Sequence, residues 1–471
     1  MNGVNITVIG AGSAVFSMRL VNDICKTPEL AGSTITLMDR DEGRLRTVLT
    51  LASKQASELD FPVTFRKTTD LIEAVEGADF VINTALVGGH TFLEEVRKIG
   101  EKHGYFRGID AQEFNMVSDY YTLTNWNQFG FMLKVARTIE KHAPNAWYLL
   151  ASNPVFEGTT LLTRHSRAKV VGFCHGYHEI EEIFKALELN PAKVDWQVAG
   201  VNHGIWVNRF LYEGEDANPR MKKYFAEQTG WKPANPFDVA LSPAAKAMFE
   251  FFGRMPVGDS IRNGGGWAWH YDNATKKKWF GEPWGGADST IGWPCYEKML
   301  GLFVETLRQL AERVEASPGE SLKDILTQYM TELPPDIAPD LKNTFDAKSL
   351  SGEQHIPFIN AIVNNVETRL VANLPNGTLI PGVAADVAVE VPVTVNKDGM
   401  HPEKIDPALP ARVIQWFLLP RILRMEWALE AFLQRDPSLT VEILLRDPRT
   451  KSVEQAEAAV KEVFEKAREF D

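Results

Sequence analysis

Residues 5–13 read Asn5-Ile6-Thr7-Val8-Ile9-Gly10-Ala11-Gly12-Ser13, a β-branched apolar run that ends in two closely spaced glycines. The apolar residues after them follow a helical spacing through Ile24. A strand, a tight glycine turn and a helix N-terminus in this order bind a pyrophosphate through backbone N–H groups and the helix dipole. Val15 stands where the fingerprint has a third glycine, so the motif alone is a weak signal. The predicted cofactor-binding residues here are Gly10, Gly12 and Ser13.

A second strand over residues 33–38 strengthens this interpretation, because it ends at Asp39. An acidic residue at this place accepts hydrogen bonds from the ribose hydroxyls of NAD. Arg40 and Arg44 follow closely and could neutralise a phosphate instead. We therefore expect NAD, and the preference over NADP stays open.

Further strands are predicted at residues 64–65, 79–84 and 147–153, separated by helical segments. Strands that alternate with helices form a doubly wound parallel sheet, which binds ligands at the carboxyl ends of its strands. Asn83 and Asn153 fall at such ends, as Gly10 and Asp39 do. The predicted fold is α/β, with a Rossmann-like NAD-binding domain over residues 1–170.

The second half, residues 171–471, is predicted to be an α+β cap that binds metal and substrate, as in lactate and malate dehydrogenases. Apolar residues have a helical spacing over 295–314 and again over 408–433, and strand-and-turn pieces surround residues 373–377 and 389–393. The segment 453–470 is an amphipathic helix that either packs at the end of the chain or contributes to an oligomer contact. We expect a homo-oligomer, a dimer or a tetramer.

Composition limits the classes of partner. The chain has 471 residues, 44% of them hydrophobic, and a formal net charge of -12, which argues against a nucleic-acid ligand. Three cysteines, widely spaced and odd in number, predict no disulfide framework and a reducing compartment. No apolar run is long enough to cross a membrane, and the N-terminus enters a strand without a basic leader. We expect a cytoplasmic protein whose partner is a small molecule.

The stretch from Cys174 to His203 carries the strongest candidate for a metal site. It contains Cys174-His175-Gly176-Tyr177 and, after a helical segment, Gly200-Val201-Asn202-His203. A thiol and an imidazole on neighbouring loops can hold a metal ion. A buried structural cysteine and a hydrogen-bonded core histidine are the alternative, which base rates favour for an isolated pair.

Together these motifs resemble the family 4 glycoside hydrolases, which depend on NAD and manganese. The resemblance covers nearly the whole chain, and these motifs carry it: Gly10-Ala11-Gly12-Ser13, Leu150-Ala151-Ser152-Asn153-Pro154, Cys174-His175-Gly176-Tyr177, Gly200-Val201-Asn202-His203, Pro256-Val257-Gly258-Asp259-Ser260, Trp269-His270-Tyr271-Asp272, Leu374-Pro375-Asn376-Gly377 and Val389-Glu390-Val391-Pro392. It implies that Cys174 and His203 are metal ligands. Glycine after Cys174-His175 looks like the branch that acts on α-linked uronic acids.

The family mechanism implies further roles. NAD takes a hydride from C3 of the sugar, a base removes the proton from C2, the leaving group is eliminated, water adds and the hydride returns. His175 is the expected general acid, since an imidazole titrates near neutral pH. Asp259 is the expected base, with Tyr271 as its rival. Asn153 and Asp119 are expected to bind sugar hydroxyls.

A uronate also needs a cation for its carboxylate. Arg262 is the first candidate, because a guanidinium binds a carboxylate through two hydrogen bonds. The run Lys276-Lys277-Lys278 is expected to be a solvated face instead, and His178 is a further candidate.

The function that the resemblance implies is a glycosidase for α-linked glucuronides or galacturonides. An α-glucosidase or α-galactosidase of the same family is one alternative, and an NAD-dependent hydroxy-acid dehydrogenase is another, because Asn153-Pro154-Val155 also suits that class. A protein that senses NAD without catalysis would need neither Cys174 nor His203.

Overall fold

The structure is a computed structural model that describes residues 3–107, 126–330, 344–345 and 350–470. Its first half is a six-stranded parallel sheet in the order β3-β2-β1-β4-β5-β6, the arrangement of dinucleotide-binding folds. β4 is buried along its whole length and β1 along all but its first residue, as expected for strands covered on both faces. The strands are β1 (Asn5–Ile9), β2 (Thr34–Met38), β3 (Thr64–Thr68), β4 (Phe80–Asn83), β5 (Trp147–Leu150) and β6 (Lys169–Gly172).

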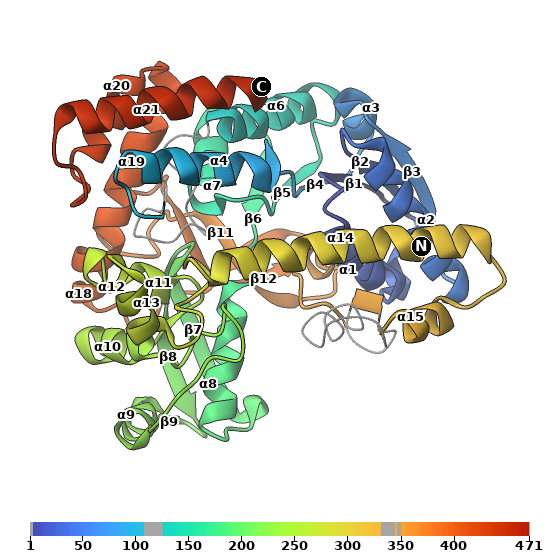
Figure 1. Cartoon of the computed structure of the whole chain (residues 1–471). Helices are drawn as coiled ribbons and strands as arrows, with labels where there is room; N and C mark the ends of the chain where they lie inside the picture. The colour runs from blue at the N-terminus through green and yellow to red at the C-terminus, as the bar shows by residue number, and fades with distance from the viewer. Residues whose placement is uncertain (1–2, 108–125, 331–343, 346–349, 471) are drawn as a thin grey trace.

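Helices lie on both sides of these strands (Figure 1). Several begin at a polar side chain that accepts a hydrogen bond from a free N–H of the first turn: Asp41 accepts one from Arg44, and Asp70 one from Glu73. The helices of this half are α1 (Ala14–Cys25), η1 (Pro28–Leu30), α2 (Glu42–Glu58), α3 (Leu71–Val75), α4 (Gly89–Lys102), α6 (Trp126–His142) and α7 (Val155–His165). The predicted doubly wound parallel sheet is thus confirmed.

The sheet does not stop at β6. Antiparallel strands of the second half extend it in the order β6-β11-β12-β7-β8-β10, so thirteen strands of the described residues belong to one sheet. Two of its junctions consist of single residue pairs, Gly172 with Asn373 and Gly200 with Glu390. The added strands are β7 (Val194–Val201), β8 (Gly204–Tyr212), β9 (Glu215–Asp216), β10 (Pro256–Val257), β11 (Thr368–Pro375), β12 (Ala388–Asn396) and β13 (Gly399–Pro402). The expected division at residue 170 falls inside β6, and the organisation into two domains stays a prediction.

Helices surround the second half as predicted, with one difference. The segment expected to be helical over residues 408–433 contains a π-helical turn before its main helix. Pro420 has no N–H to donate to residue 416, which explains why the regular α-helical pattern fails there. The helices and turns are η3 (Gly176–Glu179), α8 (Ile180–Ala186), η4 (Pro191–Lys193), α9 (Asn218–Glu227), α10 (Pro243–Phe252), α11 (Ser260–Asn263), α12 (Trp267–His270), α13 (Asn273–Phe280), α14 (Gly292–Ala316), α15 (Leu322–Met330), α17 (His355–Asn364), α18 (Ala411–Val413), η5 (Ile414–Leu418), α19 (Leu419–Gln434), α20 (Pro437–Leu444), α21 (Val453–Ala467) and η6 (Arg468–Phe470).

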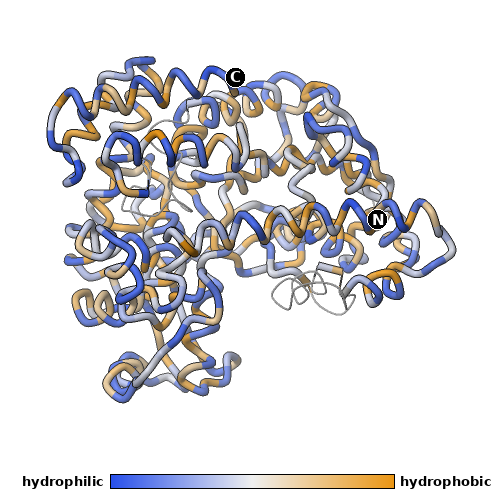
Figure 2. Tube along the Cα trace, viewed as in Figure 1, coloured by the Kyte–Doolittle hydropathy of each residue, from blue (hydrophilic) through white to orange (hydrophobic). Residues whose placement is uncertain are grey.

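The C-terminal helix α21 returns to the N-terminal half and lies beside α4 (Figure 1). Apolar residues of the two helices, among them Phe92, Ile99, Val460 and Val463, form a core of their own. The main core follows the strands, and apolar residues concentrate there while polar residues occupy the outer helical faces (Figure 2). No helix among the described residues has the length and apolarity that crossing a membrane requires.

Candidate functional site

The glycine turn after β1 is held against the end of β2. The N–H groups of Gly10 and Ala11 donate to the carbonyl of Met38 at 2.9 and 3.0 Å. Gly10 has a φ of +83°, and a Cβ there would lie 2.6 Å from the backbone of Ala85. Only glycine therefore fits at this position, and the turn is fixed before any ligand binds.

Asp39 closes this turn. Its Oδ2 accepts a hydrogen bond of 2.8 Å from the N–H of Gly12, and a Cβ on Gly12 would lie 2.6 Å from that oxygen. Its Oδ1 accepts one from the N–H of Asp41. Because a carboxylate has about four acceptor sites, both oxygens can still receive ribose hydroxyls.

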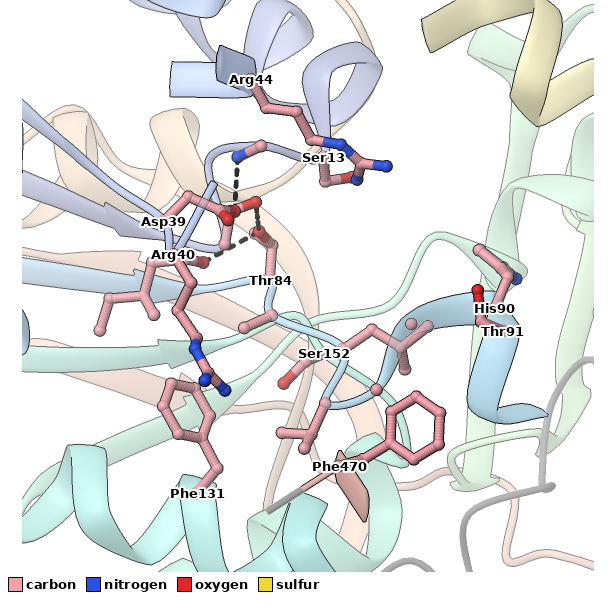
Figure 3. Close-up of a pocket in the computed structure, with 18 of the residues that line it drawn as sticks. Ser13, Asp39, Arg40, Arg44, Thr84, His90, Thr91, Phe131, Ser152 and Phe470 are labelled. Atoms are coloured by element: carbon pink, nitrogen blue, oxygen red, sulfur yellow. Dashed lines mark hydrogen bonds between the residues drawn. The ribbon is translucent and has the colours of Figure 1, made fainter. Parts of the chain in front are cut away.

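A cleft of about 1850 Å³ opens beside the turn. Ser13, Asp39, Arg40, Arg44 and Thr84 lie around its inner part, and Thr84 bridges the turn to β4 by donating to the carbonyls of Ile9 and Gly10 (Figure 3). Asn153, which follows β5, lies on its wall, and so does Phe470 from η6 at the end of the chain. The cleft combines the glycine turn and the acidic residue that a dinucleotide requires.

Asn83 lies at the end of β4, as predicted, but its side chain is buried and points into the protein. Its amide donates to the hydroxyl of Tyr148 at 2.7 Å and accepts from the N–H of Ala85 at 3.1 Å. Of the neighbouring pair, it is Thr84 that lies on the cleft. Asn83 thus shapes the cleft wall from behind.

Cys174 and His203 come together from the ends of β6 and β7. The sulfur of Cys174 lies 3.7 Å from Nε2 of His203. Burial opposes ionisation of the thiol, but the imidazole outweighs this and leaves the pKa of Cys174 below its ordinary value. Because the bonds of zinc to sulfur and nitrogen are about 2.0–2.3 Å long, two donors 3.7 Å apart can share one divalent ion of similar size. The pair therefore fits a metal site, although no cluster of three or more such donors is found within the described residues.

Asp259 approaches the same imidazole from the loop after β10. Its Oδ2 lies 3.5 Å from Nε2 of His203, and its Oδ1 is paired with the guanidinium of Arg262. Arg262 is buried and donates a further hydrogen bond of 3.1 Å to the carbonyl of Phe237. The ion pair fixes the carboxylate toward His203, while Tyr271, its predicted rival, has 51% of its surface exposed.

A close contact between two glycines brings these loops together. Gly258 has a φ of +64°, and a Cβ on it would lie 2.9 Å from the carbonyl oxygen of Gly176. The N–H of Gly258 donates to Oε2 of Glu179 at 3.0 Å. Burial raises the pKa of Glu179 to about 7. This residue, which the sequence analysis missed, holds the loop that carries Asp259.

His175 faces open space beside Cys174, and 67% of its side chain is exposed. Its Nδ1 lies 3.4 Å from Oε1 of Glu353, a buried carboxylate from the segment before α17. The attraction to Glu353 raises the pKa of His175 above its ordinary value, although solvent screens part of this effect. A histidine that keeps its proton near neutral pH can act as a general acid.

The lysine run was expected to be a solvated face, and for Lys276 this is wrong. Lys276 is 1% exposed, and its Nζ lies 2.9 Å from Nδ1 of His270 and 3.4 Å from Asp288. His270 in turn donates from Nε2 to the carbonyl of Arg262. The three lysines lie on α13, which buries one of its faces. Lys276 falls on the buried face, whereas Lys278 falls on the exposed one.

Two further residues, Asp119 and His178, were predicted to contact the sugar. Asp119 lies outside the described residues. His178 is held by the carbonyl of Gly352 at 3.0 Å and lies 3.4 Å from Glu181, so both of its ring nitrogens already face protein groups. No disulfide joins the three cysteines, all of which lie in described segments.

Known proteins share this sequence and arrangement. The model of the family 4 glycosyl hydrolases matches residues 5–189, and that of the family 4 glycosyl hydrolase C-terminal domain matches residues 198–450. An α-galacturonidase of Thermoanaerobacter italicus is 23% identical over 490 aligned positions, which cover 100% of this chain and 98% of the relative.

Solved structures agree in fold. A 6-phospho-α-glucosidase from gut microorganisms, solved with NAD and Mn²⁺, superposes with a TM-score of 0.76 at 17% identity and covers 100% of this chain and 99% of its own. The lactate dehydrogenase of Eimeria maxima superposes with a TM-score of 0.50 at 12% identity over 92% of this chain and 96% of its own, which agrees with the predicted dehydrogenase-like fold. Since the two family models together match most of the sequence, the chain belongs to family 4 of the glycosyl hydrolases.

Proposed function

We propose that this protein is an NAD- and manganese-dependent glycosidase that hydrolyses α-linked uronides. The observation that carries the proposal is that Nε2 of His203 lies 3.7 Å from the sulfur of Cys174 and 3.5 Å from a carboxylate oxygen of Asp259, with His175 next to Cys174 in the sequence. This arrangement supports the assignment of Cys174 and His203 as ligands of one metal ion, of Asp259 as the base and of His175 as the acid. Simple hydride transfer from a hydroxy acid to NAD does not require this combination.

NAD and the metal have separate places. NAD fits the cleft at Gly10, Gly12 and Asp39 and, when bound, supplies a transient oxidation of the sugar at C3. Cys174 and His203 hold a divalent ion, which when bound supplies Lewis acidity to the sugar oxygens. Thiolate is a soft ligand and Mn²⁺ a hard ion, so the support for manganese comes from the family and from a relative solved with it.

The protein's own groups move the protons. Asp259 accepts the proton of C2, and the electron pair of that C–H bond becomes the second bond between C1 and C2. The electron pair of the C1–O bond leaves with the aglycone oxygen, which His175 protonates. Water then adds to C1 and returns a proton to His175, while Asp259 returns its proton to C2. Asn153, on the wall of the cleft, binds a sugar hydroxyl.

The full-length relatedness to α-galacturonidases supports a uronide as substrate, and so does glycine after His175. Arg262 remains our candidate for the uronate carboxylate. It lies beside the base, and its Nε has no hydrogen-bond partner among the described residues. Because Arg262 also holds Asp259, its loss should affect both binding and proton removal.

Hydrolysis of four p-nitrophenyl α-glycosides tests the proposal: galacturonide, glucuronide, glucoside and galactoside, with NAD, Mn²⁺ and thiol each withheld in turn. We expect turnover of a uronide that requires both NAD and Mn²⁺ and leaves no NADH behind. Cys174→Ser should abolish it, whereas Cys25→Ser, which changes a cysteine far along the chain in α1, should keep it.

Two other outcomes would contradict parts of the proposal, one the substrate and the other the glycosidase assignment. Activity on neutral glycosides alone would keep the mechanism and replace the substrate. Accumulation of NADH from hydroxy acids without glycoside hydrolysis would contradict the glycosidase assignment.

A further inference from the structure

A buried carboxylate, Glu353, stands behind the candidate acid. It is 7% exposed, and its Oε1 lies 3.4 Å from Nδ1 of His175. Its Oε2 lies 3.9 Å from Nδ1 of His355, a buried ring that makes edge contacts with Phe16 and Phe173. The carboxylate therefore lies between an open imidazole on one side and a closed aromatic wall on the other.

Glu353 is fixed by contacts to the helix that starts at the glycine turn. Arg19 of α1 lies 4.0 Å from Oε1, and the N–H of Glu353 donates to the hydroxyl of Ser351. Ser351 is tied by its N–H and its hydroxyl to the two carboxylate oxygens of Asp23, at 2.7 and 2.5 Å. Asp23 also belongs to α1. Glu353 is thus held in place by α1, the helix that begins at the glycine turn.

The next residue fixes the other side of the segment. The side-chain amide of Gln354 exchanges two hydrogen bonds with the backbone of Val371 on β11, at 2.6 and 2.8 Å. It also donates to the carbonyl of Cys174 at 3.3 Å. The segment 351–354 is therefore attached at once to α1, to the sheet and to the loop of the candidate metal ligand.

We propose that Glu353 is the positioning residue for His175: it accepts a hydrogen bond from Nδ1 and so turns Nε2 toward the glycosidic oxygen. This inference rests on the proposed function. A neutral imidazole carries its proton on either nitrogen, and a fixed carboxylate selects the form with the proton on Nδ1. The Nε2 of that form accepts a proton from water in the hydration step, and Nε2 of the protonated ring delivers it to the leaving oxygen in the elimination step.

The choice of aglycone tests this role. A poor leaving group departs only when His175 protonates its oxygen, whereas a good leaving group departs without a proton. We compare the p-nitrophenyl and methyl glycosides of the sugar that the wild-type protein hydrolyses. Since general acid catalysis contributes about 10²–10⁴-fold, Glu353→Gln should lower kcat/KM for the methyl glycoside by about 100-fold and for the p-nitrophenyl glycoside by less than about 3-fold. Glu353→Asp, which keeps the charge, should recover part of the loss.

A matched control removes a contact of the same kind nearby. Glu181 lies 3.4 Å from Nδ1 of His178, the same separation as in the Glu353–His175 pair, and is exposed. Glu181→Gln should keep the wild-type ratio between the two substrates. An equal loss on both substrates in Glu353→Gln would assign Glu353 a structural role and overturn the inference. A wild-type protein that hydrolyses neither glycoside would instead overturn the proposed function, and this role with it.

Discussion

The glycine turn after β1 has no room for a side chain at Gly12. A Cβ on Gly12 would lie 2.6 Å from Oδ2 of Asp39, the oxygen that accepts the N–H of Gly12. Gly12→Ala should therefore displace Asp39 and weaken NAD binding by at least about tenfold, or ~1.4 kcal/mol. Titration of NADH fluorescence measures this. Gly301→Ala is the control, since Gly301 lies on the same cleft in α14 with open space around it. Equal affinity in both variants would contradict the assignment of the turn.

The buried Lys276 should give the protein a characteristic pH dependence of stability. Burial lowers the pKa of Lys276 to about 8, whereas in an unfolded chain it is about 10.4. Between these pH values the unfolded state binds a proton that the folded state has lost, so the free energy of unfolding rises with pH. The contribution is fully unfavourable below pH 8 and disappears above pH 10.4.

Urea unfolding of wild type and Lys276→Met from pH 7 to pH 10 measures this contribution as a difference. The stability of wild type relative to the variant should rise by up to ~3 kcal/mol over that window. Lys278→Met removes an exposed lysine from the same run and should show no such trend. A flat difference for Lys276→Met would show that Lys276 is not buried with its charge.

At the scale of residues, the sequence predicted those positions that depend on a single turn or strand. The positions of Gly10 in a tight turn and of Asp39 at a strand end were predictable because a turn and a strand end have their own sequence signals. Glu353 and Glu179 were missed because each acts on a segment far away in the chain, which no spacing reveals. Lys276 was misplaced because a charge run is usually solvated, and only the convergence of His270 and Asp288 makes its burial tolerable.

Among the elements, the junction of β6 with β11 has no room for an added side chain at Gly172. A Cβ on Gly172 would lie 2.7 Å from Val155 and 3.0 Å from Cβ of Asn373, and it would also meet the hydroxyl of Thr159. Gly172→Ala should therefore destabilise the protein by about 1–3 kcal/mol, as overpacking does in other cores. Thermal unfolding measures this, with Gly319→Ala, in open space, as a control within about 0.5 kcal/mol of wild type. An unchanged stability of Gly172→Ala would mean that the junction can relax.

Helices and strands with a regular spacing of apolar residues were predictable from the sequence, whereas the junctions between elements were not. Five of the six parallel strands, the helix at 295–314 and the terminal helix were expected near their observed bounds, whereas β6 (Lys169–Gly172) was not predicted. The π-helical turn at Ile414–Leu418 was not predicted either, because the helical spacing of apolar residues continues through it. The continuation of the parallel sheet into β11 and β12 was also missed, since single-pair junctions leave no pattern in the sequence.

At the scale of the whole molecule, the C-terminal turn η6 contributes to the wall of the candidate cofactor cleft. Phe470 lies on the cleft, with its ring centroid 5.1 Å from that of Phe92. Phe470→Ala should weaken NAD binding about fivefold, or ~1 kcal/mol, because it opens the cleft wall to water. Calorimetric titration with NAD measures this, and Phe251→Ala, which removes a ring with 59% of its surface exposed, is the control. An unchanged affinity in Phe470→Ala would mean that bound NAD does not reach this wall.

The unbroken sheet makes the molecule unequally tolerant of changes in chain length. Successive residues of a strand face opposite sides, so one inserted residue before Glu390 in β12 would turn that carboxyl away from Asn202, to which it is bonded at 2.8 Å. The loop of His203 would lose its support. By contrast, the turn at residues 213–214 between β8 and β9 is exposed and lies at the outer end of the sheet. Insertions, deletions and fused peptides therefore belong at that turn, and libraries aimed at new substrates should vary length there and only side chains within β7, β11 and β12.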